Sequence, residues 1–225
     1  DIGTSKVVCA VAEFSHDGDL DIVARGVYHC SGLTNGVLTN VSEAGDAIDH
    51  VIAEVEKAGY GVDKAIVGIT GESVTSSYST GVVAISGDDQ GITKADIERV
   101  IKSTNQVGVP SGSEIVTVIP RGFSVDNQRG IVNPEALIGH RLEAEAYACA
   151  ASSSYLRNLR SLLEGSGIGV YDKGFIPSSI ASSWAVLTED EKALGVMMVD
   201  MGLGTLDLAI YVNHEIAYSS VLGRG

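Results

Sequence analysis

Two glycine turns decide the fold: Asp1-Ile-Gly-Thr-Ser-Lys6 and Asp200-Met-Gly-Leu-Gly-Thr-Leu-Asp207, nearly the whole chain apart. In each, an Asp ends a strand, and glycine residues let the backbone come close to an anion. Hydroxyl and backbone N–H groups can then donate to phosphate oxygens. A single turn of this kind is a common strand connector, but two that face each other can clamp the phosphates of a nucleotide.

The residue types in the two turns predict separate roles. Asp1 and Asp200 are the expected magnesium ligands, because carboxylates hold the waters around Mg²⁺. Asp207 can take a proton, order a water or fix the hairpin, which makes it the possible catalytic residue. The remaining residues are expected to hold the phosphates through backbone, hydroxyl and charged donors, and they are Gly3, Thr4, Ser5, Lys6, Gly202, Leu203, Gly204 and Thr205.

Composition narrows the class of protein. The chain has 225 residues, 44% of them hydrophobic, which is enough for a core in one or two domains. Its formal net charge of -14 argues against nucleic acid or an anionic membrane as a direct partner. No apolar run reaches the roughly 18 residues of a membrane span. Cys9, Cys30 and Cys149 lie in apolar stretches, so we expect reduced core thiols, and the five histidines lack metal-ligand spacing.

The first third of the chain predicts a mixed α/β sheet. Residues 7–14 and 20–30 are expected strands, joined by a hairpin at Asp17-Gly18-Asp19. Ser42 is the expected cap of a helix that Gly59 ends. A short buried strand is predicted at 65–70.

The middle of the chain predicts an inserted subdomain. Residues 73–86 alternate like an edge hairpin that ends at 87–91. Thr93 and Asp96 form a capping signal for a helix with Ile97, Val100, Ile101 and Val107 on one face. Strands are expected at 113–125 and 141–151, joined by a loop at 126–139. This β-α-β-β order is typical of one helix packed on a small sheet.

The last third predicts a second copy of the opening pattern. A leucine-striped helix ends at Gly165, a strand follows near 168–171, and Pro177 begins another helix. Residues 189–191 are expected to be a solvated end. A strand at 195–200 then enters the second glycine turn, with strands expected at 206–212 and 215–221. We expect duplicated lobes, and a fragment rather than a complete protein.

The sequence between the turns resembles a known family. The turns themselves look like those of the actin, sugar kinase and DnaK-type ATPase superfamily. The middle is more specific and resembles the FtsA family of bacterial cell-division proteins, which are actin relatives. The matching segments are Val118-Ile-Pro-Arg-Gly-Phe-Ser-Val-Asp126, Gln128-Arg-Gly-Ile131, Pro134, Gly139-His-Arg-Leu-Glu-Ala144, Ala181-Ser-Ser-Trp-Ala-Val-Leu-Thr-Glu-Asp-Glu191 and Leu194-Gly195.

This resemblance implies an α/β fold with an actin-like (ribonuclease H-like) lobe. Subdomain IA would comprise residues 1–72 and 152–192, the inserted subdomain IC residues 73–151, and the truncated beginning of subdomain IIA residues 193–225. The implied cofactors are ATP and Mg²⁺. The implied activity is at most a weak ATPase, because the Pro177 helix offers Ser178 and Ser179 where related ATPases place an acidic or amide side chain. Leu203 departs from the family, which usually has Gly there, and can narrow approach to the phosphates.

The resemblance also implies partners. Such proteins polymerise into filaments, bind FtsZ through the second lobe and recruit later division proteins, in part through subdomain IC. They lie on the cytoplasmic face of the inner membrane at the division site, held by a C-terminal amphipathic helix. The adenine pocket, the FtsZ-binding part and this helix would lie beyond residue 225. The 225-residue chain alone is therefore expected neither to hold ATP tightly nor to bind FtsZ.

Two alternatives remain open. A pilus-assembly adaptor of the PilM type has a similar insert and grips a short membrane-protein tail. A small-molecule kinase of the same superfamily would need a catalytic base, for which Asp126 and Asp172 are candidates by residue type.

Overall fold

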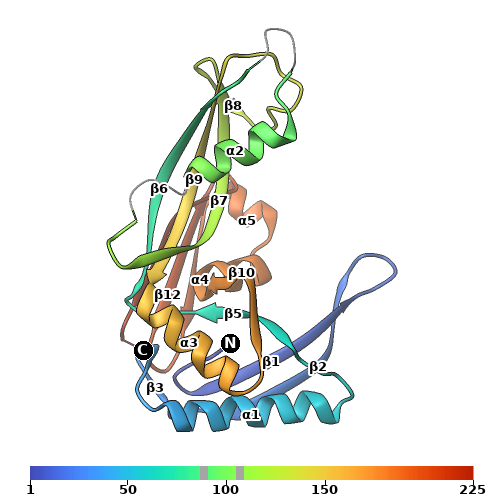
Figure 1. The fold of residues 1–225 in the computed structure, drawn as a ribbon, viewed down its shortest axis with the longest axis vertical. Helices are drawn as coiled ribbons and strands as arrows, with labels where there is room; N and C mark the ends of the chain where they lie inside the picture. Colours follow the sequence, from blue (N-terminus) through green and yellow to red (C-terminus); the bar gives the residue numbers. More distant parts are fainter. Residues whose placement is uncertain (87–90, 105–108, 225) are drawn as a thin grey trace.

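The computed structural model describes residues 1–86, 91–104 and 109–224. Figure 1 shows an elongated molecule, in which a body holds both chain ends and the inserted subdomain rises from it. The expected face residue Val107 and the expected turn residues 87–90 lie outside the described part. Within that part, no helix is long and apolar enough to cross a membrane.

The first lobe is an α/β body around one hydrophobic core. The hairpin of β1 and β2 lies across α1, and β5 pairs in parallel with β10 (Figure 1). Leu156, Leu159, Leu162 and Leu163 line the buried side of α3, as the leucine stripe predicted. The elements are β1 (Lys6–Phe14), β2 (Leu20–His29), β3 (Leu33–Thr34), β4 (Val37–Leu38), α1 (Val41–Lys57), β5 (Lys64–Ile69), α3 (Ser153–Gly165), β10 (Gly169–Pro177) and α4 (Ser178–Val186).

A groove of about 720 Å³ separates β1 from β5. It is lined by the free edge of β1 at residues 8–12 and by β5 residues 64–67. The two strands belong to different ladders, since β1 pairs with β2 and β5 pairs with β10.

The insert has a sheet and a core of its own. Its strands lie in the order β6-β9-β7-β8, and α2 packs against β6 and β9. The predicted β-α-β-β order is confirmed, with the short strand β8 added inside the expected loop. The expected hairpin at 73–86 is wrong, because β6 is one continuous strand that pairs with β9 along its length. The elements are β6 (Val74–Ala84), α2 (Lys94–Thr104), β7 (Ser113–Val125), β8 (Gln128–Ile131) and β9 (Arg141–Ser152).

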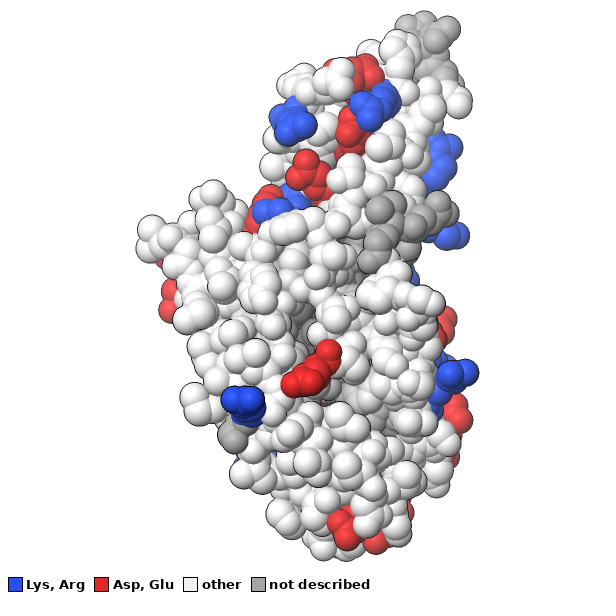
Figure 2. Space-filling model, turned by 90° about the vertical axis from the view of Figure 1, so that its left-hand side faces the viewer, with Lys and Arg blue, Asp and Glu red and all other residues white. Residues whose placement is uncertain are grey.

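The last strands form a three-stranded antiparallel sheet, β11-β12-β13. The strand register puts Met197, Val199 and Met201 on one face of this sheet, where they are exposed. Ala209 and Tyr211 lie on the opposite face and are buried. Figure 2 shows that charged side chains on the face it displays gather mainly at the insert end, above a wide area with few charges. The elements are β11 (Val196–Met201), β12 (Leu206–Val212) and β13 (Glu215–Leu222).

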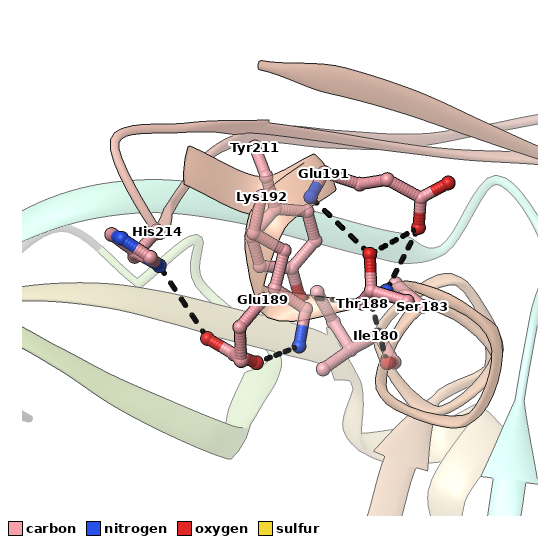
Figure 3. Close-up of polar contacts among 8 residues, drawn as sticks. All are labelled: Ile180, Ser183, Thr188, Glu189, Glu191, Lys192, Tyr211 and His214. Carbon is pink, nitrogen blue, oxygen red and sulfur yellow. Dashed lines mark hydrogen bonds and ion pairs between the residues drawn. The ribbon is translucent and has the colours of Figure 1, made fainter. Parts of the chain in front are cut away.

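Two local expectations need correction. The cap of α1 is Asn40, whose side chain accepts from the Glu43 N–H at 3.3 Å, so the helix begins before Ser42. Residues 189–191 are exposed, as expected, but they form the first turn of a further helix, α5 (Glu189–Leu194). Thr188 and Glu191 cap this helix reciprocally, at 3.3 Å and 2.8 Å (Figure 3).

The helix α5 is fastened to the β12–β13 hairpin. Lys192 is 8% exposed, and its ammonium lies 2.8 Å from Glu189 and over the Tyr211 ring (Figure 3). The Lys192 carbonyl accepts from the His214 N–H at 3.0 Å. These contacts hold the turn between β12 and β13, at the opposite end of β12 from the second glycine turn.

Candidate functional site

The two glycine turns have the same backbone arrangement. The Gly3 N–H donates to the Lys6 carbonyl at 2.9 Å, and the Gly202 N–H donates to the Thr205 carbonyl at 2.9 Å. The flanking residues also match. The Val8 N–H donates to the Asp1 carbonyl, and Asp207 is the strand partner of Asp200. The predicted duplication is thus visible in the hydrogen bonds, and the N–H groups of Gly3 and Gly202 close their own turns.

The structure brings the two turns into contact. A Cβ atom built on Gly204 would lie 2.8 Å from the Thr4 hydroxyl oxygen and 3.0 Å from the Asn35 backbone nitrogen. Real Cβ atoms do not approach other atoms so closely, so a residue with a side chain does not fit this position unless the turns separate. Gly204 and Thr205 are both buried by this contact.

A third turn, which the sequence patterns had not predicted, lies between the first two. Asn35 and Gly36 have positive φ values of 50° and 75° and connect β3 to β4. The Gly36 N–H donates to the Thr4 hydroxyl at 3.3 Å, and a Cβ on Gly36 would lie 3.2 Å from the Thr205 methyl carbon. Asn-Gly between short apolar pairs is a strong hairpin signal, and it could have located this turn.

The two predicted metal ligands take different positions. The Asp200 carboxylate accepts from the Ser182 hydroxyl at 2.8 Å. Asp1 is exposed and lies beside Gly68 of β5, whose built Cβ would be 3.6 Å from an Asp1 carboxylate oxygen. Among the described residues, no three His, Cys, Asp or Glu side chains are arranged to hold a metal ion. A magnesium ion at this place would therefore depend largely on water and phosphate oxygens.

Asp207 carries a buried carboxylate beside the second turn. It is 4% exposed, its Oδ2 accepts from the Thr70 hydroxyl at 2.7 Å, and its Oδ1 has no hydrogen-bond partner. Burial raises the pKa of this carboxyl above its usual value. The neighbouring Tyr155 hydroxyl donates to the Thr70 carbonyl at 3.0 Å, and burial raises the pKa of Tyr155 to about 12. The first turn has Val8 at the position of Asp207, so only the second turn carries this group.

The other predicted residues lie at the surface or serve the fold. Lys6 is exposed, and the Leu203 side chain is 65% exposed. Asp126 accepts from the His140 and Arg141 N–H groups at 2.9–3.1 Å, which fixes a turn of the insert. It therefore lies in the insert rather than beside the glycine turns.

A seam of hydroxyl groups joins the insert to β13. The Tyr147 hydroxyl donates to Ser76 at 2.5 Å, and the Ser76 hydroxyl donates to the Ser219 carbonyl at 3.0 Å. The Ser219 N–H returns a bond to the Tyr147 oxygen at 2.6 Å. Since β13 pairs with β12, this ring ties the insert to the sheet that carries the second turn.

The donor set at the junction of the turns fits the phosphates of a nucleotide. Thr4, Ser5 and Thr205 supply hydroxyls, and Thr4 lies where the turns touch, beside Gly204 and the Gly36 N–H. Glycine at 36 and 204 lets the backbones of the turns approach one another closely. Among the described residues of the turns, Lys6 is the positively charged side chain, and it is exposed to solvent.

Comparison with known proteins identifies relatives of this chain. Residues 71–149 match the model of the SHS2 domain inserted in FtsA. The chain is 37% identical to the cell division protein FtsA of Pseudomonas aeruginosa and 34% identical to that of Bacillus subtilis. These matches cover 99% and 100% of this chain, but 52% and 51% of the relatives, so the chain spans about half their length.

The structural comparison agrees at the level of the fold. The PilM–PilN type IV pilus biogenesis complex contains a chain that matches with a TM-score of 0.66 and 12% identity. The match covers 99% of this chain and 60% of that chain. The lobe is therefore actin-like, with the SHS2 insert and the start of a second lobe. On the sequence matches along its whole length, the chain belongs to the FtsA family of cell-division proteins.

Proposed function

We propose that the protein is an ATP-binding, actin-like adaptor of cell division. The observation that carries the proposal is the junction of two duplicated glycine turns in a chain that has the FtsA-type insert. A clamp of this kind recognises phosphates through backbone and hydroxyl donors, so it suits a nucleotide better than an uncharged metabolite.

The residues of the junction divide the work of binding. Thr4, Ser5 and Thr205 donate hydroxyl hydrogens to phosphate oxygens, with Gly3, Gly202 and Gly204 giving the backbone its shape. Asp1 and Asp200 hold the waters of a Mg²⁺ ion, which would neutralise phosphate charge when bound. Asp207 is held in place by Thr70.

Hydrolysis is proposed to be slow. The first turn of α4 contains no acidic residue, and its residues Ser178 and Ser179 offer hydroxyls. The Ser178 hydroxyl is buried without a partner and lies beside Gly68. A hydroxyl is a poor general base near neutral pH, so this position does not activate a water strongly.

The partners of the proposed adaptor follow from the family. We propose self-association into filaments, binding of FtsZ through a second lobe, and recruitment of later division proteins through residues 73–151. The proposed site of action is the cytoplasmic face of the inner membrane at the division septum, where a C-terminal helix attaches the protein to lipid and the Z-ring to the membrane.

The similarity to the PilM chain supports a second candidate, a pilus-assembly adaptor. Such an adaptor would grip a short cytoplasmic tail of a pilus membrane protein. The kinase alternative has no comparable support, because Asp126 is engaged by three backbone hydrogen bonds in the insert.

One experiment separates these functions. The full gene product is mixed with ATP and Mg²⁺ and presented with immobilised FtsZ tail or with a pilus-type cytoplasmic tail. Retention on the FtsZ tail together with ATP binding supports the division adaptor. Retention on the pilus tail alone supports the second candidate, and phosphoryl transfer to a panel of sugars would revive the kinase.

A further inference from the structure

The two glycine turns touch in this structure, so phosphates enter between them only if the turns move apart. A Cβ on Gly204 would already lie 2.8 Å from the Thr4 hydroxyl oxygen, and Gly204 is buried. The second turn leads directly into β12, which pairs with β13 along its whole length. Because a ladder of backbone hydrogen bonds holds these two strands together, a shift of the second turn carries β13 with it.

The other edge of β13 faces the insert, and side-chain hydroxyls occupy it in place of a neighbouring strand. The Tyr78 hydroxyl donates to the Ala217 carbonyl at 2.5 Å. Two residues further along, the Ser219 carbonyl accepts from the Ser76 hydroxyl, and the Ser219 N–H donates to the Tyr147 oxygen. The strands β6 and β13 belong to different sheets. The insert is therefore fastened to β13 by rotatable hydroxyl groups, which can follow a moving strand or release it.

A charged contact lies at the beginning of β13. Arg121 of β7 pairs with Glu215 at 2.6 Å, and its guanidinium lies over the Tyr78 ring, 4.8 Å from the ring centre. The rings of Tyr78 and Tyr147 in turn pack edge to face. The insert thus contacts β13 from its first residue to its middle, while the other edge of the same strand is bonded to the strand of the second turn.

We propose that β13 transmits nucleotide binding from the glycine turns to the insert. Phosphates that part the turns displace β12 and β13, and the insert then tilts with β13 or loses its hydroxyl contacts. The inference rests on the proposed ATP binding and extends it to the regulation of the insert. Coupling between two sites is reciprocal, so a partner that holds the insert in one orientation also changes the ATP affinity. Couplings of this kind change affinities by about 5- to 150-fold.

Hydrogen–deuterium exchange of the full gene product, with and without Mg²⁺ and a non-hydrolysable ATP analogue, tests the coupling. Amides of the two glycine turns report on binding. Amides of α2 and β7 report on the insert, since these elements contain none of the proposed nucleotide-binding residues. In the wild type, the nucleotide is expected to change the exchange rates in both places. In Ser76→Ala/Tyr78→Phe/Tyr147→Phe, the turns are expected to respond as before, while the response of the insert falls by at least about fivefold.

A second variant and a control complete the test. Ser76→Ala/Tyr78→Phe keeps the bond from the Ser219 N–H to the Tyr147 oxygen, so it is expected to fold and to show an intermediate response. If the triple variant unfolds, this double variant decides in its place. Tyr218→Phe, at a half-exposed tyrosine of the same strand, is the matched control and is expected to respond as the wild type does.

Two results would overturn the coupling. In one, the nucleotide changes exchange at the turns of the wild type but not in the insert. In the other, the insert responds equally in the wild type and in the variant that lacks the hydroxyl contacts. A wild-type protein whose turns do not respond to the nucleotide would instead overturn the proposed function, so the two failures are distinguishable.

Discussion

Asp207 places a carboxylate in the interior beside the second turn, with one oxygen bonded to Thr70 and the other without a partner. Burial raises its pKa, so the folded state holds the proton more tightly than the unfolded chain does. The contribution of such a group to stability is greatest below the unfolded pKa, and it falls as the pH rises through the folded pKa. The free energy of unfolding of the protein is therefore expected to depend on pH through Asp207.

Replacement of Asp207 by Asn tests this consequence. As the pH rises above about 4, the ordinary pKa of an Asp side chain, the wild type is expected to lose stability relative to Asp207→Asn, because only the wild type must ionise a buried acid. Urea denaturation at several pH values measures the difference in the free energy of unfolding. Parallel pH profiles for the two proteins would contradict the assigned environment.

Gly204 is the point of closest approach between the two turns. Gly204→Val is expected to push Thr4 and Asn35 away and to weaken ATP binding by at least about tenfold, since the phosphate donors would no longer converge. The matched control is Gly61→Val, at a glycine where an added Cβ meets no atom within 4 Å. Calorimetric titration of the full gene product measures the affinity. Unchanged affinity in Gly204→Val would count strongly against the second turn as a nucleotide site.

At the scale of elements, the hydroxyl seam fastens β6 and β9 of the insert to β13. Tyr147 is 2% exposed, and its hydroxyl both donates to Ser76 and accepts from the Ser219 N–H. Tyr147→Phe would leave that buried N–H without a partner, which costs about 1–3 kcal/mol. The predicted fall in Tm is several degrees, measured by thermal denaturation. Tyr218→Phe, at a half-exposed position, is the control and is expected to leave the Tm unchanged. Equal Tm values for both variants would show that the seam adds nothing.

The helix α2 has an exposed charged face, which we propose as a contact surface for partners of the insert. Lys94, Glu98 and Lys102 recur at helical spacing and are exposed. Lys102→Glu is expected to disturb filament or partner contacts while ATP binding and stability change little. Lys57→Glu is the control, because Lys57 is likewise an exposed basic residue in the last turn of a helix, α1. If sedimentation and recruitment assays give the same result for both variants, this face of α2 is only a solvated surface.

Most elements follow from local patterns in the sequence, and the errors have local causes. Alternation and helical spacing predicted β1, β2, α3, β7, β9 and β11–β13 to within a few residues. The expected cap at Ser42 was wrong because Asn40 competes for the same role two residues earlier. The helix α5 was not predicted, because its acidic first turn resembles a solvated loop in the sequence. Thr188 and Glu191 have the spacing of a capping box, which could have indicated the helix.

At the scale of the whole molecule, the contacts that build the site are long-range, and local patterns do not specify them. Thr70 and Asp207 meet across a sequence separation of 137 residues, and Tyr147 and Ser219 across 72. The similarity of the two glycine turns in the sequence predicted that they act as a pair. The position of the third turn between them depends on how β3 and β4 fold back on each other.

We propose that the junction of the turns is a nucleotide site. The most direct measurement is a crystal structure of the full gene product grown with Mg²⁺ and a non-hydrolysable ATP analogue. We predict phosphate density between the turns at residues 3–5 and 202–205, with a metal near Asp1 and Asp200. A saturated crystal with the nucleotide elsewhere, or with no nucleotide at the junction, would contradict the account.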